Sequence, residues 1–210
     1  MITRALIILN VLAYVWELYT GALRSDAALI RDGVLTPQLV LQYHEWWRII
    51  TSAFLHGGIA HIGLNMLSLY WLGRFIEAVL GSPRMLLVYM VSLVVSGLTI
   101  VFFSAYNVPT LGASGAIFGL FGALFAIGIK LGDRGTDLVR SNIGILVLNL
   151  IFSFTFPGIS WQAHVGGLFA GFLTTLLVFW PPRPVYTPVY DSQSGTPYQS
   201  QVEMPDDQRH

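Results

Sequence analysis

Three long stretches without a charged side chain constrain this 210-residue chain more than any other feature. No Asp, Glu, Lys or Arg occurs over residues 49–73, 85–129 or 141–182, which are 25, 45 and 42 residues long. A membrane-spanning helix needs about 20 predominantly apolar residues. Charged residues make up only 10% of the chain, against about 25% in soluble domains. The sequence therefore predicts an all-α polytopic membrane protein.

The two longest stretches are each interrupted by a turn signal, so each predicts two helices joined by a hairpin. The interruptions are Asn107-Val108-Pro109 and Pro157-Gly158. An apolar segment near the N-terminus adds a first span, although a signal peptide is an alternative interpretation of it. We expect six transmembrane helices, at residues 5–23, 57–79, 84–104, 114–131, 140–156 and 162–180.

Lysine and arginine counts predict the orientation of these helices. With the N-terminus inside, eight of the eleven basic residues lie on the inner side and three on the outer side. We therefore expect both termini inside. Residues 24–56 then form a long interfacial outer loop, rich in Trp and Leu, between helices one and two. Residues 1–180 form the membrane domain, and the Pro-rich residues 181–210 are expected to be a disordered inner tail.

Composition excludes several kinds of function. The net charge is zero and there is no cysteine. A basic nucleic-acid-binding protein is therefore excluded, and so are disulfides, a thiolate nucleophile and a Cys-based zinc site. We expect no metal and no other cofactor. Histidines 56, 61 and 164 form an alternative metal-ligand set, but no carboxylate or thiolate completes it. His56 is better interpreted as a polar lining or loop contact.

Polar side chains at membrane depth are costly and often mark function. His61 and Asn65 lie near the start of predicted helix two, Ser114 opens helix four and His164 opens helix six. In the predicted topology these three helices all begin at the outer face. The four side chains therefore lie in one layer, which predicts a common site.

Glycine spacing predicts which of these helices touch. Helix four carries Gly115, Gly119 and Gly122, and helix six carries Gly167 and Gly171. Small residues four apart let two helices approach closely in a bilayer. If these faces meet, the residues that open the two helices come within hydrogen-bond reach.

The resulting pair has the chemistry of a serine nucleophile and its general base. A serine hydroxyl needs such a base at neutral pH, and the oxyanion formed on attack needs donors. The side chains of His61 and Asn65 and the backbone N–H of Ser114 can donate to the oxyanion. No Asp or Glu lies near this layer, so we expect a dyad of Ser114 and His164 without a third member.

These residues resemble the motifs of the rhomboid family of intramembrane serine proteases. The matching motifs are His61-x-x-x-Asn65, Gly112-x-Ser114-Gly115, Ala163-His164-x-x-Gly167-x-x-x-Gly171 and, in the outer loop, Trp47-Arg48. The resemblance implies that Ser114 is the nucleophile and His164 the general base, with His61, Asn65 and the Ser114 amide at the oxyanion. One position departs from the family pattern, because Phe118 replaces a common tyrosine and lacks its hydroxyl.

The resemblance implies a serine endopeptidase that cleaves membrane proteins in or near their transmembrane segments. Its partners would be transmembrane substrates and the lipid bilayer, not nucleic acid. A non-catalytic relative that binds client transmembrane segments is the main alternative, and a small channel is another. We expect a multi-pass protein of a bacterial or archaeal plasma membrane, since no long N-terminal extension is present. The sequence predicts neither the substrate nor the oligomeric state.

Overall fold

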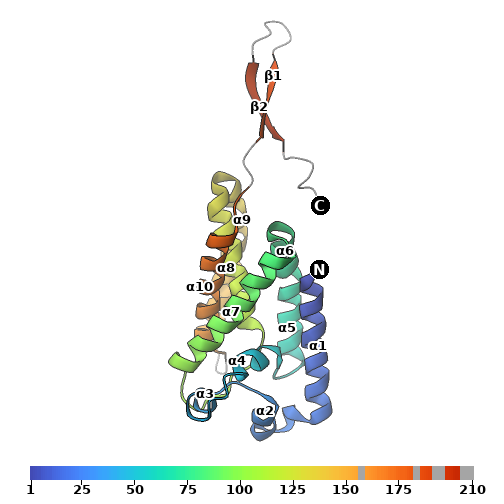
Figure 1. The fold of residues 1–210 in the computed structure, drawn as a ribbon, viewed down its shortest axis with the longest axis vertical. Coiled ribbons are helices and arrows are strands. Elements are labelled where there is room, and N and C mark those ends of the chain that lie inside the picture. The colour runs from blue at the N-terminus through green and yellow to red at the C-terminus, as the bar shows by residue number, and fades with distance from the viewer. Residues whose placement is uncertain (156–158, 182–184, 191–196, 204–210) are drawn as a thin grey trace. The chain divides into compact units, whose positions relative to one another are not determined.

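A computed structural model describes residues 1–155, 159–181, 185–190 and 197–203, and the chain forms two units, Met1–Phe179 and Trp180–His210. The first unit is a helical bundle (Figure 1). Its α-helices are α1 (Ile2–Thr20), α2 (Asp26–Asp32), α3 (Pro37–Tyr43), α4 (Arg48–Thr51), α5 (Ile59–Ser68), α6 (Arg74–Leu80), α7 (Ser82–Phe103), α8 (Ser114–Leu131), α9 (Thr136–Thr155) and α10 (Trp161–Val178). Short 3₁₀ turns are η1 (Ala22–Arg24), η2 (Ser52–Phe54) and η4 (Gly132–Gly135), and η3 (Leu69–Gly73) is a π-helical turn.

Four helical stretches in the described part of the chain are long and apolar enough to cross a membrane. They are Ile2–Thr20, Ser82–Phe103, Ser114–Thr155 and Trp161–Val178. The third stretch consists of α8 and α9 joined by η4, and α5, η3 and α6 follow one another without a break over residues 59–80. The number of spans and the inward position of both termini stay predictions. The expected interruption at Pro157-Gly158 lies outside the described residues.

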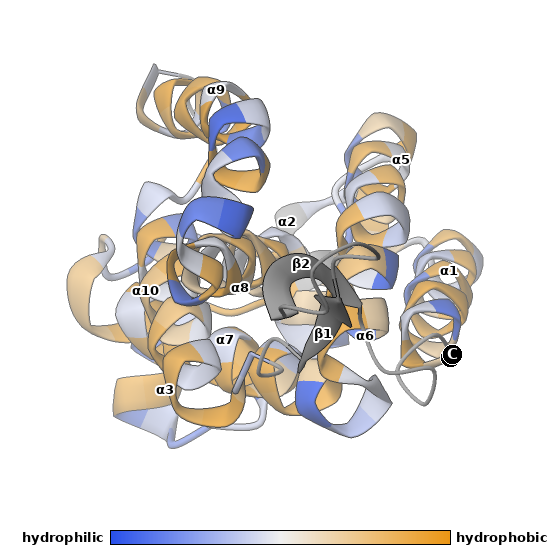
Figure 2. Cartoon of the chain, turned by 90° about the horizontal axis from the view of Figure 1, so that it is seen from above, coloured by the Kyte–Doolittle hydropathy of each residue, from blue (hydrophilic) through white to orange (hydrophobic). Residues whose placement is uncertain are grey.

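Burial separates a central helix from peripheral ones. In α8, 13 of 18 residues are buried, whereas in α9 only Leu146 and Ser153 of 20 residues are buried. Large apolar side chains on α1 and α9 are exposed, and Figure 2 shows both helices as predominantly hydrophobic. An exposed apolar surface of this extent is expected where a helix faces lipid rather than water.

Two buried carboxylates fasten α1 to the rest of the bundle. Both oxygens of Glu17 accept from the backbone N–H of His56, at 3.1 and 3.0 Å. Glu77 accepts from the hydroxyls of Thr3, at 2.7 Å, and Ser82, at 2.5 Å. A buried carboxylate needs such donors. The first of these contacts holds the segment immediately before α5, which carries part of the site described below.

The outer loop of the sequence analysis contains α2, α3, α4 and η2, which gather at one end of the bundle (Figure 1). Arg48 is buried and ties this region together. Its guanidinium donates to the carbonyls of Ile30, at 2.7 Å, and Val34, at 3.0 Å, and it pairs with Glu45. It also lies over the Trp47 ring, 4.5 Å from the ring centroid. These contacts give the Trp-Arg pair a structural role, since they hold the loop residues around it together.

The second unit contains two strands, β1 (Val185–Tyr190) and β2 (Pro197–Glu203), which pair antiparallel. The register places Val185 opposite Glu203 and Tyr190 opposite Pro197. Valine, threonine and tyrosine in β1 favour an extended backbone. The proline content of residues 181–210 predicts no regular structure here. The described residues 185–190 and 197–203 form this hairpin, and the disorder of the tail as a whole stays a prediction.

Candidate active site

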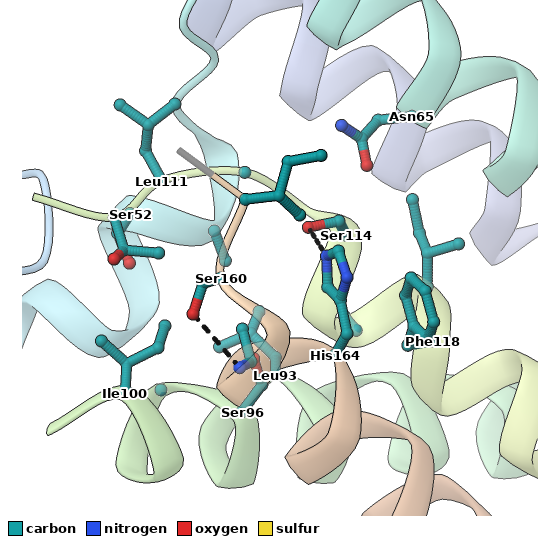
Figure 3. A pocket seen from close by; sticks show the side chains of 18 of the residues that line it. Ser52, Asn65, Leu93, Ser96, Ile100, Leu111, Ser114, Phe118, Ser160 and His164 are labelled. Atoms are coloured by element: carbon teal, nitrogen blue, oxygen red, sulfur yellow. Dashed lines mark hydrogen bonds between the residues drawn. The ribbon is translucent and has the colours of Figure 1, made fainter. Parts of the chain in front are cut away.

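Ser114 and His164 meet at the beginnings of two neighbouring helices. Ser114 is the first residue of α8, and His164 lies in the first turn of α10. The imidazole Nε2 of His164 lies 2.8 Å from Oγ of Ser114, which is a normal hydrogen-bond distance (Figure 3). Ser160 caps α10 by accepting from the backbone N–H of Ala163 at 3.3 Å. The predicted meeting of this serine and histidine is confirmed.

The glycines of α8 and α10 explain how the two helices come so close. A Cβ on Gly167 would lie 1.9 Å from the carbonyl oxygen of Gly115, and one on Gly171 would lie 1.9 Å from that of Gly119. A Cβ on Gly122 would lie 2.1 Å from another backbone oxygen of α10. Backbone therefore touches backbone at these three positions, and no side chain fits between the helices there. The predicted contact between the two glycine faces is confirmed.

His61 reaches the site from α5 because Gly112 has no side chain. A Cβ on Gly112 would lie 2.8 Å from both Cε1 and Nε2 of His61, and the backbone there has a φ of +120° that disfavours other residues. The backbone N–H of Gly57 donates to Nδ1 of His61 at 3.3 Å. A neutral imidazole whose Nδ1 accepts carries its proton on Nε2. His61 therefore presents an N–H donor beside Gly112.

Asn65 lies one turn further along α5 and is buried. Its Nδ2 donates to the carbonyl of His61 at 3.0 Å. An amide nitrogen carries two donor hydrogens, and this bond uses one of them. Figure 3 shows Asn65 among the side chains that line the same pocket as Ser114. The predicted pair on α5 thus lies on the same side of the bundle as the serine.

A cavity of about 420 Å³ joins these side chains. Its lining includes His61, Asn65, Ser114, Phe118 and His164, contributed by α5, α8 and α10 (Figure 3). Residues of α7, α9 and the Ser52 region complete the wall. The size is within the range of pockets that hold small ligands or short peptide segments. The four polar residues singled out from the sequence therefore share one cavity.

Two further side chains contact the imidazole of His164. The Phe118 ring stacks on it, with ring centroids 4.0 Å apart and planes inclined by 9°. Oγ of Ser153, on α9, lies 2.6 Å from Nδ1. Phe118 was singled out from the sequence as a departure from the family pattern, whereas Ser153 was not singled out. The available signal was a polar residue at membrane depth in a predicted span, the same signal that identified the other site residues.

His56 lies next to the site but is directed elsewhere. Its ring meets that of His61 edge to face, with centroids 5.0 Å apart, and its Nδ1 lies 3.2 Å from the carbonyl of Phe54. Burial is the main factor that lowers the pKa of His56 to about 4, and the neighbouring His61 adds to the effect. His56 is therefore neutral at pH 7. Its contacts are those of a loop residue, as the sequence analysis interpreted it.

In the described part of the chain, no group of three or more His, Asp or Glu side chains is placed to hold a metal ion. The site is therefore a hydroxyl, an imidazole and a set of amide and imidazole donors around one cavity. That combination can perform acyl transfer through a serine nucleophile.

Sequence comparison places this geometry in a family. A sequence model described as the rhomboid domain matches residues 43–181. The chain belongs to the rhomboid family. It is 35% identical over 171 residues to the rhomboid protease GluP of Bacillus subtilis, covering 81% of this chain and 33% of that protein. This chain thus spans about a third of the length of GluP.

Two further relatives match over most of this chain. The putative rhomboid protease YdcA of Bacillus subtilis is 34% identical over 171 residues, covering 81% of this chain and 85% of the relative. The rhomboid protease GlpG of Yersinia pestis (strain Pestoides F) is 32% identical over 185 residues, covering 87% of this chain and 63% of the relative. The matched region includes the residues that form the cavity, since the family match begins before α4 and ends after α10. Family membership and the apolar helices together identify an integral membrane protein.

Proposed function

We propose that this protein is an intramembrane serine endopeptidase that hydrolyses peptide bonds in or near transmembrane segments of membrane proteins. The observation that carries the proposal is the 2.8 Å contact between Oγ of Ser114 and Nε2 of His164 within a shared cavity. The relatives named rhomboid proteases support the same class of activity. Ser114 is the proposed nucleophile and His164 the proposed general base.

The proposed reaction proceeds through an acyl-enzyme. His164 Nε2 takes the hydroxyl proton as Ser114 Oγ attacks the substrate carbonyl, and the same proton then goes to the leaving amine. The C–N bond breaks and an ester to Ser114 remains. Water attacks this ester with His164 again as base, which releases the acid and restores the hydroxyl.

We propose three donors for the oxyanion of this reaction. The Nε2–H of His61 and the remaining amide hydrogen of Asn65 come from α5. The third is the backbone N–H of Ser114, which is in the first turn of α8 and so has no intrahelical acceptor. Donors fixed in advance lower the barrier because they need no reorganisation when the charge develops.

The substrate must present an unpaired peptide bond, because carbonyls in an intact helix are already hydrogen-bonded. We therefore infer that cleavage occurs where a transmembrane helix unwinds. The proposal includes six spans with both termini inside, which places the site near the outer face of the bilayer. The apolar helices and the family membership support this arrangement.

Replacing Ser114 by alanine tests the proposal. We expect Ser114→Ala to lose cleavage of a transmembrane reporter by about 10⁴-fold or more and to lose labelling by a serine-reactive fluorophosphonate. The thermal unfolding midpoint in detergent should stay near that of the wild type. Ser141→Ala is a matched control, because Ser141 is exposed and its hydroxyl bonds only within its own helix. It contacts two carbonyl oxygens, at 2.7 and 3.2 Å, and accepts from Nδ2 of Asn142 at 3.1 Å.

Two outcomes would overturn the assignment. Cleavage by purified Ser114→Ala at the wild-type rate would exclude Ser114 as the nucleophile. A wild-type protein that neither cleaves nor reacts with the probe would favour the non-catalytic alternative, which binds client transmembrane segments without hydrolysing them.

A further inference from the structure

Ser153 is one of the two buried residues of α9 and contacts His164 directly. Its Oγ lies 2.6 Å from Nδ1 of His164, on the side of the ring opposite to the nitrogen that faces Ser114. The same Oγ lies 2.7 Å from the carbonyl oxygen of Asn149, one turn earlier in α9. The hydroxyl therefore has two partners at short distance.

The hydrogens of this pair of bonds can be assigned from the chemistry of the groups. A serine hydroxyl has one hydrogen, and a carbonyl oxygen only accepts. The hydroxyl of Ser153 must therefore donate to Asn149 and accept from His164. This requires a hydrogen on Nδ1 of His164, and the neutral ring then has a bare Nε2 facing the hydroxyl of Ser114.

We propose that Ser153 is a positioning residue that holds His164 in the Nδ1–H tautomer, which is the form that accepts a proton from Ser114. The inference rests on the proposed function for its catalytic consequence, although the tautomer itself does not depend on activity. When Nε2 takes the proton of Ser114, the ring becomes a cation and the bond from Nδ1–H to Ser153 becomes charge-assisted. Such bonds are about twice as strong as neutral ones, so Ser153 stabilises the charged state more than the neutral one.

Phe118 and Ser153 constrain different degrees of freedom of the ring. Stacking on Phe118 fixes the plane of the imidazole, but a ring turned over by 180° stacks equally well. Hydrogen bonds at both nitrogens distinguish the two orientations, because the turned ring would present its carbons Cδ2 and Cε1 where Nδ1 and Nε2 now meet the hydroxyls of Ser153 and Ser114. In a dyad without a carboxylate, Ser153 thus supplies the orientation that stacking leaves open.

The experiment compares Ser153→Ala with Ser153→Thr and with Thr155→Val. Thr155 is a matched control two residues away, because its hydroxyl makes the same kind of bond to a carbonyl one turn earlier, at 2.8 Å, but is exposed. We expect Ser153→Ala to lower kcat by about tenfold to a hundredfold, from the loss of one charge-assisted bond, with KM within about twofold. Ser153→Thr keeps a hydroxyl and should restore most of kcat, and Thr155→Val should resemble the wild type.

Nitrogen-15 NMR of the imidazole in detergent reads the tautomer without any turnover. The His164 signals are assigned by their loss in His164→Asn. We expect wild-type Nδ1 to be protonated and Nε2 bare, and we expect Ser153→Ala to show a mixture of both tautomers. Thermal unfolding of each variant identifies any loss of kcat that comes from a damaged fold.

Three results would overturn the inference: a protonated Nε2 in the wild type, unchanged imidazole shifts in folded Ser153→Ala, or a wild-type kcat in that variant. Failure of the proposed function gives a different pattern. A wild type that neither cleaves nor reacts with a fluorophosphonate removes the catalytic consequence, while the imidazole shifts still decide whether Ser153 sets the tautomer.

Discussion

Replacing Gly171 by alanine tests whether the contact between α8 and α10 sets the distance between Ser114 and His164. The added Cβ would lie 1.9 Å from the carbonyl oxygen of Gly119, and real Cβ atoms essentially never approach a heavy atom closer than 3.0 Å. The obstacle is backbone, so it cannot rotate away as a side chain would. The helices must therefore separate locally by about 1.1 Å, which is the difference between these two distances.

That separation reaches the site because a helix transmits it. Gly171 lies two turns beyond His164 on α10, roughly 10 Å away. If α10 moves as a rigid body, the bond of 2.8 Å between the two side chains lengthens to about 3.9 Å, outside hydrogen-bond range. A misplacement of about 1 Å in a catalytic group costs around a hundredfold in rate. Overpacking of this kind also costs about 1–3 kcal/mol of stability.

Cleavage of a reporter with one transmembrane helix, in liposomes, measures the rate, and thermal unfolding in detergent measures the stability. Gly144→Ala on α9 is the matched control, because a Cβ there would meet nothing within 4 Å. We expect the control to match the wild type in rate and to be equal or slightly higher in stability. Wild-type cleavage by a folded Gly171→Ala variant would refute the claim that glycine contacts position the dyad.

Two further predictions concern the neighbours of the site. His56→Asn should remove part of the pH dependence of stability. Burial lowers the pKa of His56 from 6.5 to about 4, so between these pH values only the unfolded chain binds this proton. The unfolding free energy of the wild type should therefore fall by up to about 3 kcal/mol as the pH drops from 6.5 to 4, and the variant should lack this contribution. Denaturant titrations of both proteins across this range measure the difference, and equal slopes would exclude His56 as a contributor. Phe118→Leu should lower kcat about threefold to tenfold, since it removes a stacked ring worth about 0.5–1.5 kcal/mol. Phe118→Tyr keeps an aromatic ring and should stay within about twofold of the wild type. Steady-state cleavage rates measure both variants, and a larger loss in the tyrosine variant than in the leucine variant would contradict the stacking role.

The central part of the site could be predicted because its determinants are local in sequence. Glycines four residues apart define a helix face whatever the surroundings, and a contact between two such faces follows from close backbone packing. The position of Ser114 and His164 at the starts of their helices then follows from counting residues. His61 and Asn65 lie one turn apart on α5 for the same reason. Each of these inferences needs the helix alone, without its exact orientation.

Ser153 could not be placed in this way because α9 has no pattern that orients it. Its apolar residues surround the helix, and only two of its 20 residues are buried. Periodicity therefore does not tell which side faces the bundle. The hydroxyl near His164 depends on the rotation of α9 about its own axis, which only the tertiary structure defines. The hairpin of β1 and β2 is a different case, since Pro188 and Pro197 lie within its strands and outweigh the β-branched and aromatic residues beside them in a sequence-based prediction.

The two ring nitrogens of His164 are held by helices that pack differently against α10. At Nε2, the distance to Ser114 is set by the contact between α8 and α10, where backbone packs directly on backbone at the glycines. On the other side, Nδ1 bonds to a residue of α9, whose surface is mostly exposed. A displacement of α9 by about 1 Å would break the hydrogen bond between Nδ1 of His164 and Ser153. The distance between Nε2 and Oγ of Ser114 would stay unchanged, but the bond that holds the Nδ1–H tautomer would be lost.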